Sequence, residues 1–311
     1  MRSSAGVEVR RAMGRPHYNK GMPLSRRSFL TVALASAARA QTPPRARTGP
    51  VLCLYSKTLP DVEYPELGPI LNGLGFDGCD LSVQPDGTVK PANTSVDMVR
   101  SVESLTGDGL EVPVITTSFL SIGEPWARNV LAVAGGSGVP FFRTGYSRYP
   151  AARLLERRNE IYALASYGRA ARMAMGVPYP AARGLIGDLD PQWVGWDFDT
   201  ALAIDEGSLP EALPRLRMLV LRDMRRDKGP ATACPLGEGV VDWPAIFTGL
   251  AKARFSGPLT LLLEYQAQDR LQAIRKDLEF ARKMLNEAYE KELGPTSPRP
   301  SNASRDGKSR A

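Results

Sequence analysis

The chain has 311 residues, enough for one large α/β domain, because a (β/α)8 barrel takes roughly 250 residues. Its formal net charge of +7 would suit a nucleic acid or an anionic membrane, but the charge is not evenly spread. Of the 40 Lys/Arg and 33 Asp/Glu residues, the first 40 positions hold eight and one, so the rest of the chain is balanced. We therefore expect no nucleic-acid partner.

The basic N-terminus has the pattern of a twin-arginine signal peptide. Ser25 to Leu30 read SRRSFL, a short apolar segment follows, and Ala38-Arg39-Ala40 form a small-residue cleavage site before Gln41. We expect residues 1–40 to be a signal peptide that directs export to the periplasm or medium; a disordered basic N-terminus is the alternative. The apolar segment is shorter than the about 20 residues that cross a bilayer, so no stable membrane anchor is expected.

The next part of the chain alternates predicted strands with helices. A Pro/Arg-rich linker over residues 41–50 leads into the first strand. After it, apolar residues at helical spacing predict the helices, and turn residues such as Gly75 predict where they end. The predicted strands are residues 51–55, 76–81, 112–116 and 141–144, and the predicted helices begin near 64, 95 and 127.

The second half continues the alternation with one irregularity. A long helix is predicted over residues 151–170, but the Pro/Gly-rich residues 178–191 leave room only for a reduced fifth helix. The last helix has apolar residues at steps of three and four, and residues 295–311 read as a disordered tail. The remaining predicted strands are residues 173–177, 193–198, 217–221 and 259–263, with helices at 209–216 and from 243.

Eight strands that alternate with helices predict a (β/α)8 barrel over residues 51–290 rather than an open doubly wound sheet. Such barrels keep their chemistry at the carboxyl ends of the strands. The polar residues predicted to converge there are Lys57, Asp80, Arg143, Asp199, Arg222, Asp223 and Glu264, with Glu238 in the loop before the last strand. Each could instead cap a helix or form a structural ion pair. Glu264 is the most informative, because an ionised group after a five-residue apolar strand needs a partner or a function.

The three cysteines, Cys53, Cys79 and Cys234, give an odd number without CxxC spacing, which argues against a cysteine zinc site. Cys53 and Cys79 fall on neighbouring predicted strands, so a disulfide between them is one alternative. Buried free thiols are the preferred expectation.

Several segments of the chain are similar to segments of a known family. The resemblance is carried by a terminal pattern, Leu-Gly-Glu-Gly, then Asp-Trp before a helix, then GPxxxxxEY, and by four earlier strand segments. These earlier segments are GFDGCDLSVQPDG, GVPFFRTGYSRYP, DPQWVGWDFD and LRMLVLRD. These segments resemble the sugar phosphate isomerase/epimerase family, whose fold is the xylose isomerase-like TIM barrel. The resemblance implies the barrel fold, a sugar or polyol as the ligand, and copies that pair as a homo-oligomer.

The family also implies a divalent metal, Mn²⁺ or Mg²⁺, held by Glu, Asp, His and Glu on strands five to eight. Asp199 and Glu264 match the ligands of strands six and eight. The histidine position holds Val220, residues 174–178 offer no carboxylate or imidazole, and the only histidine is His17 in the leader. The metal set is therefore incomplete, and a chain that uses no metal is the alternative.

Two functions follow from the resemblance. One is a sugar isomerase or epimerase that moves a proton between adjacent carbons, with Glu264 and Asp199 as catalytic residues and as partial metal ligands. Its substrate-binding residues would be Lys57, Asp80, Arg143, Arg222 and Glu238. The other is a non-catalytic carbohydrate-binding barrel that has lost the metal.

Overall fold

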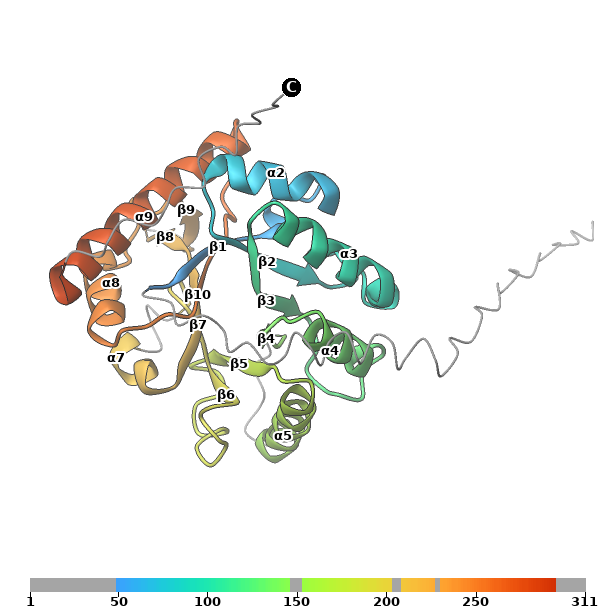
Figure 1. Ribbon diagram of the computed structural model, residues 1–311. Helices are drawn as coiled ribbons and strands as arrows, with labels where there is room; N and C mark the ends of the chain where they lie inside the picture. The colour runs from blue at the N-terminus through green and yellow to red at the C-terminus, as the bar shows by residue number, and fades with distance from the viewer. Residues whose placement is uncertain (1–48, 146–152, 203–207, 227–229, 295–311) are drawn as a thin grey trace, which may run out of the picture. The chain divides into compact units, whose positions relative to one another are not determined.

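The computed structural model describes residues 49–145, 153–202, 208–226 and 230–294, which contain a closed barrel of eight parallel strands. Around the barrel the strands follow the order β1-β10-β7-β6-β5-β4-β3-β2. Figure 1 shows them at the centre, with the helices outside them. Their bounds are β1 Val51–Tyr55, β2 Gly78–Val83, β3 Glu111–Thr117, β4 Phe141–Arg143, β5 Ala174–Tyr179, β6 Val194–Asp199, β7 Leu216–Leu221 and β10 Pro258–Leu261.

Capping residues mark an end of some of the helices between the strands. The Asp242 carboxylate accepts a hydrogen bond from the amide of Ala245 (3.1 Å) at the start of α8, and α2 ends at Gly75 with a φ of +95°. The bounds are α2 Tyr64–Leu74, α3 Thr94–Gly107, α4 Ala127–Gly136, α5 Leu154–Ala170, α7 Leu209–Ala212, α8 Trp243–Lys252 and α9 Arg270–Leu293.

The link between β5 and β6 confirms the predicted reduced fifth helix. Residues 180–193, all described, form turns and no helix. Prolines at both ends and glycines at 184 and 187 disfavour a regular helix there. The following helix is also short, because α7 passes after four residues into the 3-10 turn Leu213–Arg215.

Two kinds of packing fill the barrel. Outward-facing strand residues such as Leu52, Leu54 and Phe142 are buried in one continuous apolar core with helix residues such as Leu67 and Phe247. The strands also carry buried polar and charged side chains. Successive side chains of a strand point to opposite faces of the sheet. The apolar side chains face the helices, and the side chains between them face the barrel interior.

Some predicted boundaries were wrong by a few residues. β2 runs to Val83, so Asp80 lies within the strand and not at its end, and β10 stops at Leu261. A two-stranded antiparallel sheet, β8 Asp223–Arg225 with β9 Thr232–Cys234, was not predicted, because these three-residue strands carry no apolar alternation.

Other sequence-based expectations are tested only in part. The three cysteines are buried and form no disulfide, which disagrees with the disulfide alternative. The predicted leader, most of the linker and the predicted tail lie outside the described residues. Within the described ranges, no helix has both the length and the apolar character needed to cross a membrane.

Candidate active site

The barrel brings six charged residues together as two sets, each with one arginine between two carboxylates. The deep triad is Asp80, Arg143 and Asp197, from β2, β4 and β6. The mouth triad is Asp199, Arg222 and Glu264, at or just after the carboxyl ends of β6, β7 and β10. The two sets join residues that are scattered along the sequence, as the barrel prediction required.

In the deep triad, Arg143 joins two buried carboxylates. Its Nε donates to Asp197 Oδ2 (2.7 Å), and its Nη1 contacts Asp80 Oδ2. Two threonine hydroxyls complete the shell of Asp80, since Thr116 Oγ1 donates to Oδ1 (2.6 Å) and Thr260 Oγ1 donates to Oδ2 (2.9 Å). The side chains of the three charged residues are each at most 9 % exposed. A charge pair this deep keeps its ions only because both partners are present.

Strand register explains why these side chains meet. Thr116 pairs with Arg143, and Arg143 pairs with Gly176 on the next strand. Gly176 has no side chain, and a Cβ there would lie 2.7 Å from the side chain of Met218. Since Gly176 adds no bulk beside Arg143, the guanidinium reaches past β5 to Asp197 on β6.

Burial controls the electrostatics of the deep triad. It raises the pKa of the Asp197 carboxyl to about 6. Arg143 lowers this pKa and so offsets part of the shift, whereas the charges of Asp199 and Asp80 raise it further. Burial by itself would lower the pKa of Arg143, but Asp197 and Asp80 reverse this and raise it. Nη2 of Arg143 and Oδ1 of Asp197 have no hydrogen-bond partner among the described protein atoms. The triad is therefore tightly paired but not fully satisfied.

In the mouth triad, Arg222 joins the two residues that the sequence resemblance predicts to be metal ligands. Its Nε and Nη2 lie 3.2 and 2.8 Å from Oδ1 and Oδ2 of Asp199, and its Nη1 contacts Oε2 of Glu264. The side chains of Arg222 and Asp199 are 13 % and 16 % exposed, whereas that of Glu264 is 50 % exposed. Solvent therefore reaches this triad from the Glu264 side.

The backbone holds Asp199 and Arg222 in position. Asp199 Oδ1 also accepts from the amides of Ala201 and Leu202 (3.0 and 3.2 Å). The hydroxyl of Thr200 donates to the carbonyl of Arg222 (2.6 Å) and accepts from its amide (2.9 Å). Burial raises the pKa of Asp199, although Arg222 and the two amides lower it. Burial lowers the pKa of Arg222, but Asp199 and Glu264 outweigh it, and the net shift is upward.

Two other predicted site residues are paired elsewhere. Lys57 forms an ion pair with Asp86 (2.5 Å), whose pKa it lowers by hydrogen bonding. Glu238 contacts Arg225, with both side chains about half exposed. Lys57 and Glu238 therefore lie outside both triads, and their predicted role in substrate binding stays a prediction.

Asp223 has a structural role that explains the family-like pattern around it. Its carboxylate accepts from the amides of Gly237 (2.9 Å), Gly239 (3.1 Å) and Val241 (3.2 Å), and from Nε1 of Trp243 (2.9 Å). A Cβ at Gly239 would lie 2.0 Å from Asp223 Oδ1, so only glycine fits. The Leu-Gly-Glu-Gly and Asp-Trp motifs thus fold the loop before α8 around one buried carboxylate.

Sequence reasoning missed Asp197, Thr116 and Thr260. Asp197 had a usable signal, since it stands two residues before Asp199 in WDFD and so faces the same side of β6. The two threonines had none, because a hydroxyl within an apolar strand is common and its partner comes from a distant strand.

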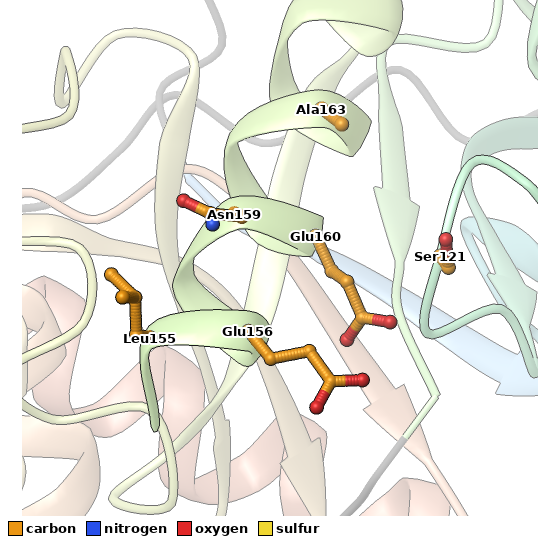
Figure 2. Close-up of a pocket in the computed structure, with 6 residues that line it drawn as sticks. All are labelled: Ser121, Leu155, Glu156, Asn159, Glu160 and Ala163. Carbon is orange, nitrogen blue, oxygen red and sulfur yellow. The ribbon is translucent and has the colours of Figure 1, made fainter. Parts of the chain in front are cut away.

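A shallow depression lies beside the barrel, against helix α5 (Figure 2). The Glu156 and Glu160 side chains extend from α5 toward the loop that carries Ser121. Glu156 is already paired with Arg153 (3.1 Å). The depression is lined by no member of either triad and is not part of the candidate site.

The residues present do not fit a divalent metal of the family type. Asp199 and Glu264 are two carboxylates with a guanidinium between them, and the histidine position is the buried Val220. In the described part of the chain, no group of three or more His, Cys, Asp or Glu side chains could hold a metal ion. A metal at this position would first have to displace Arg222.

Comparison with solved structures identifies the fold. No family model and no curated protein matches the chain. The structure of L-ribulose 3-epimerase superposes with a TM-score of 0.63 at 15 % identity, covering 81 % of this chain and 100 % of that one. A xylose isomerase-like TIM barrel protein from Mycobacterium smegmatis, in complex with magnesium, gives 0.58 at 18 % identity, over 74 % and 92 %.

A third neighbour, the IOLI protein with a bound zinc atom, gives a TM-score of 0.59 at 13 % identity, over 79 % of this chain and 100 % of that one. Two of the three neighbours are thus described with a metal, whereas this chain has an arginine between the two matching carboxylates. Identities this low establish the fold alone. The chain has the fold of the xylose isomerase-like TIM barrel proteins, which include sugar isomerases and epimerases.

Proposed function

We propose that this protein binds a sugar or polyol at the mouth of the barrel and moves a proton between adjacent carbons of it. The observation that supports this most is the mouth triad. Two carboxylates that match family ligands are fixed around one cation at the carboxyl ends of the strands, where barrel enzymes bind substrate. The sugar epimerases among the structural neighbours support a small sugar as the ligand.

Each residue of the mouth triad has a distinct role in this reaction. Glu264, the most exposed, takes the proton from the carbon next to the substrate carbonyl as the C–H bond breaks. The electron pair moves to the carbonyl oxygen, giving an enediolate that Arg222 stabilises by N–H donation. A guanidinium has five N–H groups and three face carboxylates, so two remain for substrate oxygens.

The second half of the reaction returns the proton. In an isomerisation, Glu264 delivers it to the adjacent carbon while a proton passes between the two enediolate oxygens. In an epimerisation, Asp199 delivers a proton to the opposite face of the same carbon. Burial raises the pKa of Asp199, which favours its carrying a proton.

The charge of the site favours a neutral ligand. The two triads together contain four carboxylates and two guanidiniums, so the barrel interior is negative when all are ionised. A phosphorylated sugar would bring further negative charge and would be repelled. Unphosphorylated sugars and polyols are therefore the expected class.

The direct test is hydrogen exchange at the carbons of the sugar. The full-length protein is incubated in D₂O with a panel of ketoses and aldoses, and proton NMR follows the loss of C–H signals. We expect exchange that disappears in Glu264→Gln and persists in Glu211→Gln. Glu211 is a matched control, since it is also an exposed carboxylate paired with an arginine, Arg183 (2.8 Å).

One observation favours the non-catalytic alternative. Arg222 engages both carboxylates of the mouth triad, so neither is an unpaired base before the ligand binds. Sugar binding by calorimetry without exchange at any carbon would identify a carbohydrate-binding barrel. Neither binding nor exchange over the panel would contradict both functions.

The location proposed for the protein is the periplasm or the medium, reached by the twin-arginine pathway. The support is the SRRSFL pattern and the site before Gln41. N-terminal sequencing of protein from cells is expected to find a chain that begins at Gln41. A mature chain that starts well before Gln41 would contradict export.

A further inference from the structure

We infer that the guanidinium of Arg222 takes the place of a divalent cation between Asp199 and Glu264, so that the site excludes Mn²⁺ and Mg²⁺. Removal of this one guanidinium should open a two-carboxylate metal site. The inference rests on the mouth triad and not on the proposed proton transfer, since it concerns only which cation the carboxylates hold.

The geometry places the guanidinium where a shared metal would lie. Arg222 contacts both carboxylates at once, with Asp199 on its Nε and Nη2 edge and Glu264 on its Nη1. Both oxygens of Asp199 are occupied, at 3.2 and 2.8 Å. A metal bridging Asp199 and Glu264 would have to share these oxygens with the guanidinium, which would bring two cations into contact.

The positive charge of Arg222 is the main reason why a divalent metal ion is excluded. A guanidinium is always charged in proteins, so Arg222 places a fixed positive charge between Asp199 and Glu264. A divalent ion would have to approach this fixed positive charge within a few ångströms. Once the charge is removed, the two carboxylates with added waters form the kind of site that binds Mg²⁺ or Mn²⁺.

The neighbouring residues are consistent with a cation built into the chain. Val220 stands at the histidine position and is 5 % exposed, so it provides no ligand and faces no solvent. Thr200 holds the backbone of Arg222 through two hydrogen bonds, which fixes the start of the side chain. The cation is therefore positioned by the fold and does not depend on metal supply.

The test measures Mn²⁺ binding by the loss of the electron paramagnetic resonance signal of free Mn²⁺, a readout that is independent of activity. The full-length proteins compared are the wild type, Arg222→Gln, and the double variant Arg222→Gln with Glu264→Gln. Gln keeps much of the length of Arg and a donor for Asp199, which favours folding. Arg183→Gln is the control, because it releases the exposed carboxylate of Glu211 elsewhere.

We expect the wild type to bind Mn²⁺ no more tightly than Glu264→Gln does. Arg222→Gln should bind at least about tenfold more tightly than the wild type, since one positive charge has been removed beside the carboxylates. The double variant should lose this gain, and Arg183→Gln should show none.

Two results would overturn the inference. One is wild-type Mn²⁺ binding that Glu264→Gln abolishes, and this comparison remains valid even if Arg222→Gln does not fold. The other is a folded Arg222→Gln, by circular dichroism, that binds Mn²⁺ no better than the wild type. The proposed function is tested separately, because hydrogen exchange in the wild type with EDTA present depends on neither result.

Discussion

The deep and mouth triads have the same composition, one arginine between two carboxylates, but water reaches them differently. The carboxylates of the deep triad are 0 % and 9 % exposed, whereas Glu264 in the mouth triad is 50 % exposed. In the deep triad, threonine hydroxyls from β3 and β10 surround Asp80. In the mouth triad, one side of the guanidinium faces the entrance.

The same kind of ion pair is therefore expected to have a different role in each triad. A buried arginine that loses a carboxylate, or a carboxylate that loses its arginine, is left as an uncompensated charge in a poorly solvated place. At the mouth, water reaches Glu264 and can replace a partner lost there at little cost, so this side of the triad is available for ligands. We expect the deep triad to act on stability and the mouth triad on function.

The largest expected effect comes from Arg143→Met. The change leaves Asp80 and Asp197 buried without their cation and should lower the free energy of unfolding by about 3–5 kcal/mol. Urea denaturation measures the loss, and Arg183→Met, at an exposed pair, is the control, with about 1 kcal/mol or less. Adding Asp197→Asn to Arg143→Met should recover part of the loss. Equal losses of unfolding free energy in Arg143→Met and Arg183→Met would show that burial does not make the deep triad more important for stability than an exposed ion pair.

The next effect is a dependence of stability on pH. Burial raises the pKa of Asp197 from its ordinary 3.8 to about 6, so the folded protein keeps this proton to a higher pH than the unfolded chain does. The contribution of Asp197 to stability should therefore fall by about 1–3 kcal/mol as the pH rises from about 4 to about 6, and stay level above.

Unfolding free energies across this pH range, for the wild type and Asp197→Asn, isolate the contribution. Asp86→Asn serves as an opposite-sign control, because Lys57 lowers the pKa of Asp86 and its contribution is lost as the pH falls. A wild type and an Asp197→Asn variant with the same pH dependence would show that Asp197 titrates normally.

A smaller loss of stability is expected from Arg222→Gln. The guanidinium and Asp199 are mostly buried, but Glu264 and the entrance let water in, so the unfolding free energy should fall by about 1–2 kcal/mol. The same urea experiment measures it. A loss of unfolding free energy as large as that of Arg143→Met would mean that the mouth triad contributes as much to stability as the deep triad does.

The smallest change in stability is expected from Glu264→Gln, at most about 1 kcal/mol, since the pair it breaks is half exposed. Hydrogen exchange in the sugar should nevertheless be lost in this variant. This combination, normal stability without exchange, separates a catalytic group from a structural one. Exchange at the wild-type rate would exclude Glu264 as the base.

Local sequence patterns were enough to determine the architecture of the barrel. Apolar runs such as residues 51–55 predict strands buried on both faces, and the apolar positions of the last helix predict an amphipathic surface. The prolines and glycines of residues 178–191 correctly predicted that the fifth helix is reduced. These signals are local because hydrogen bonding and side-chain periodicity are set within a few residues.

The sequence also indicated which polar residues face the barrel mouth. The strands are parallel, so polar residues that follow them all lie at the same end of the barrel. It named five of the six members of the two triads and missed Asp197. It could not indicate which residues pair. Asp80 and Thr260 lie 180 positions apart in sequence, and they meet only because β1 closes the barrel between β2 and β10.

The cation between Asp199 and Glu264 was likewise decided by tertiary structure. From the sequence, Arg222 was one more polar residue at a strand end, and the two carboxylates suggested a metal. Only the closed barrel places β7 between β6 and β10, so that a side chain following β7 lies between carboxylates from both neighbours. Strand order in a closed sheet is a long-range property, and it determines which charge stands between which partners.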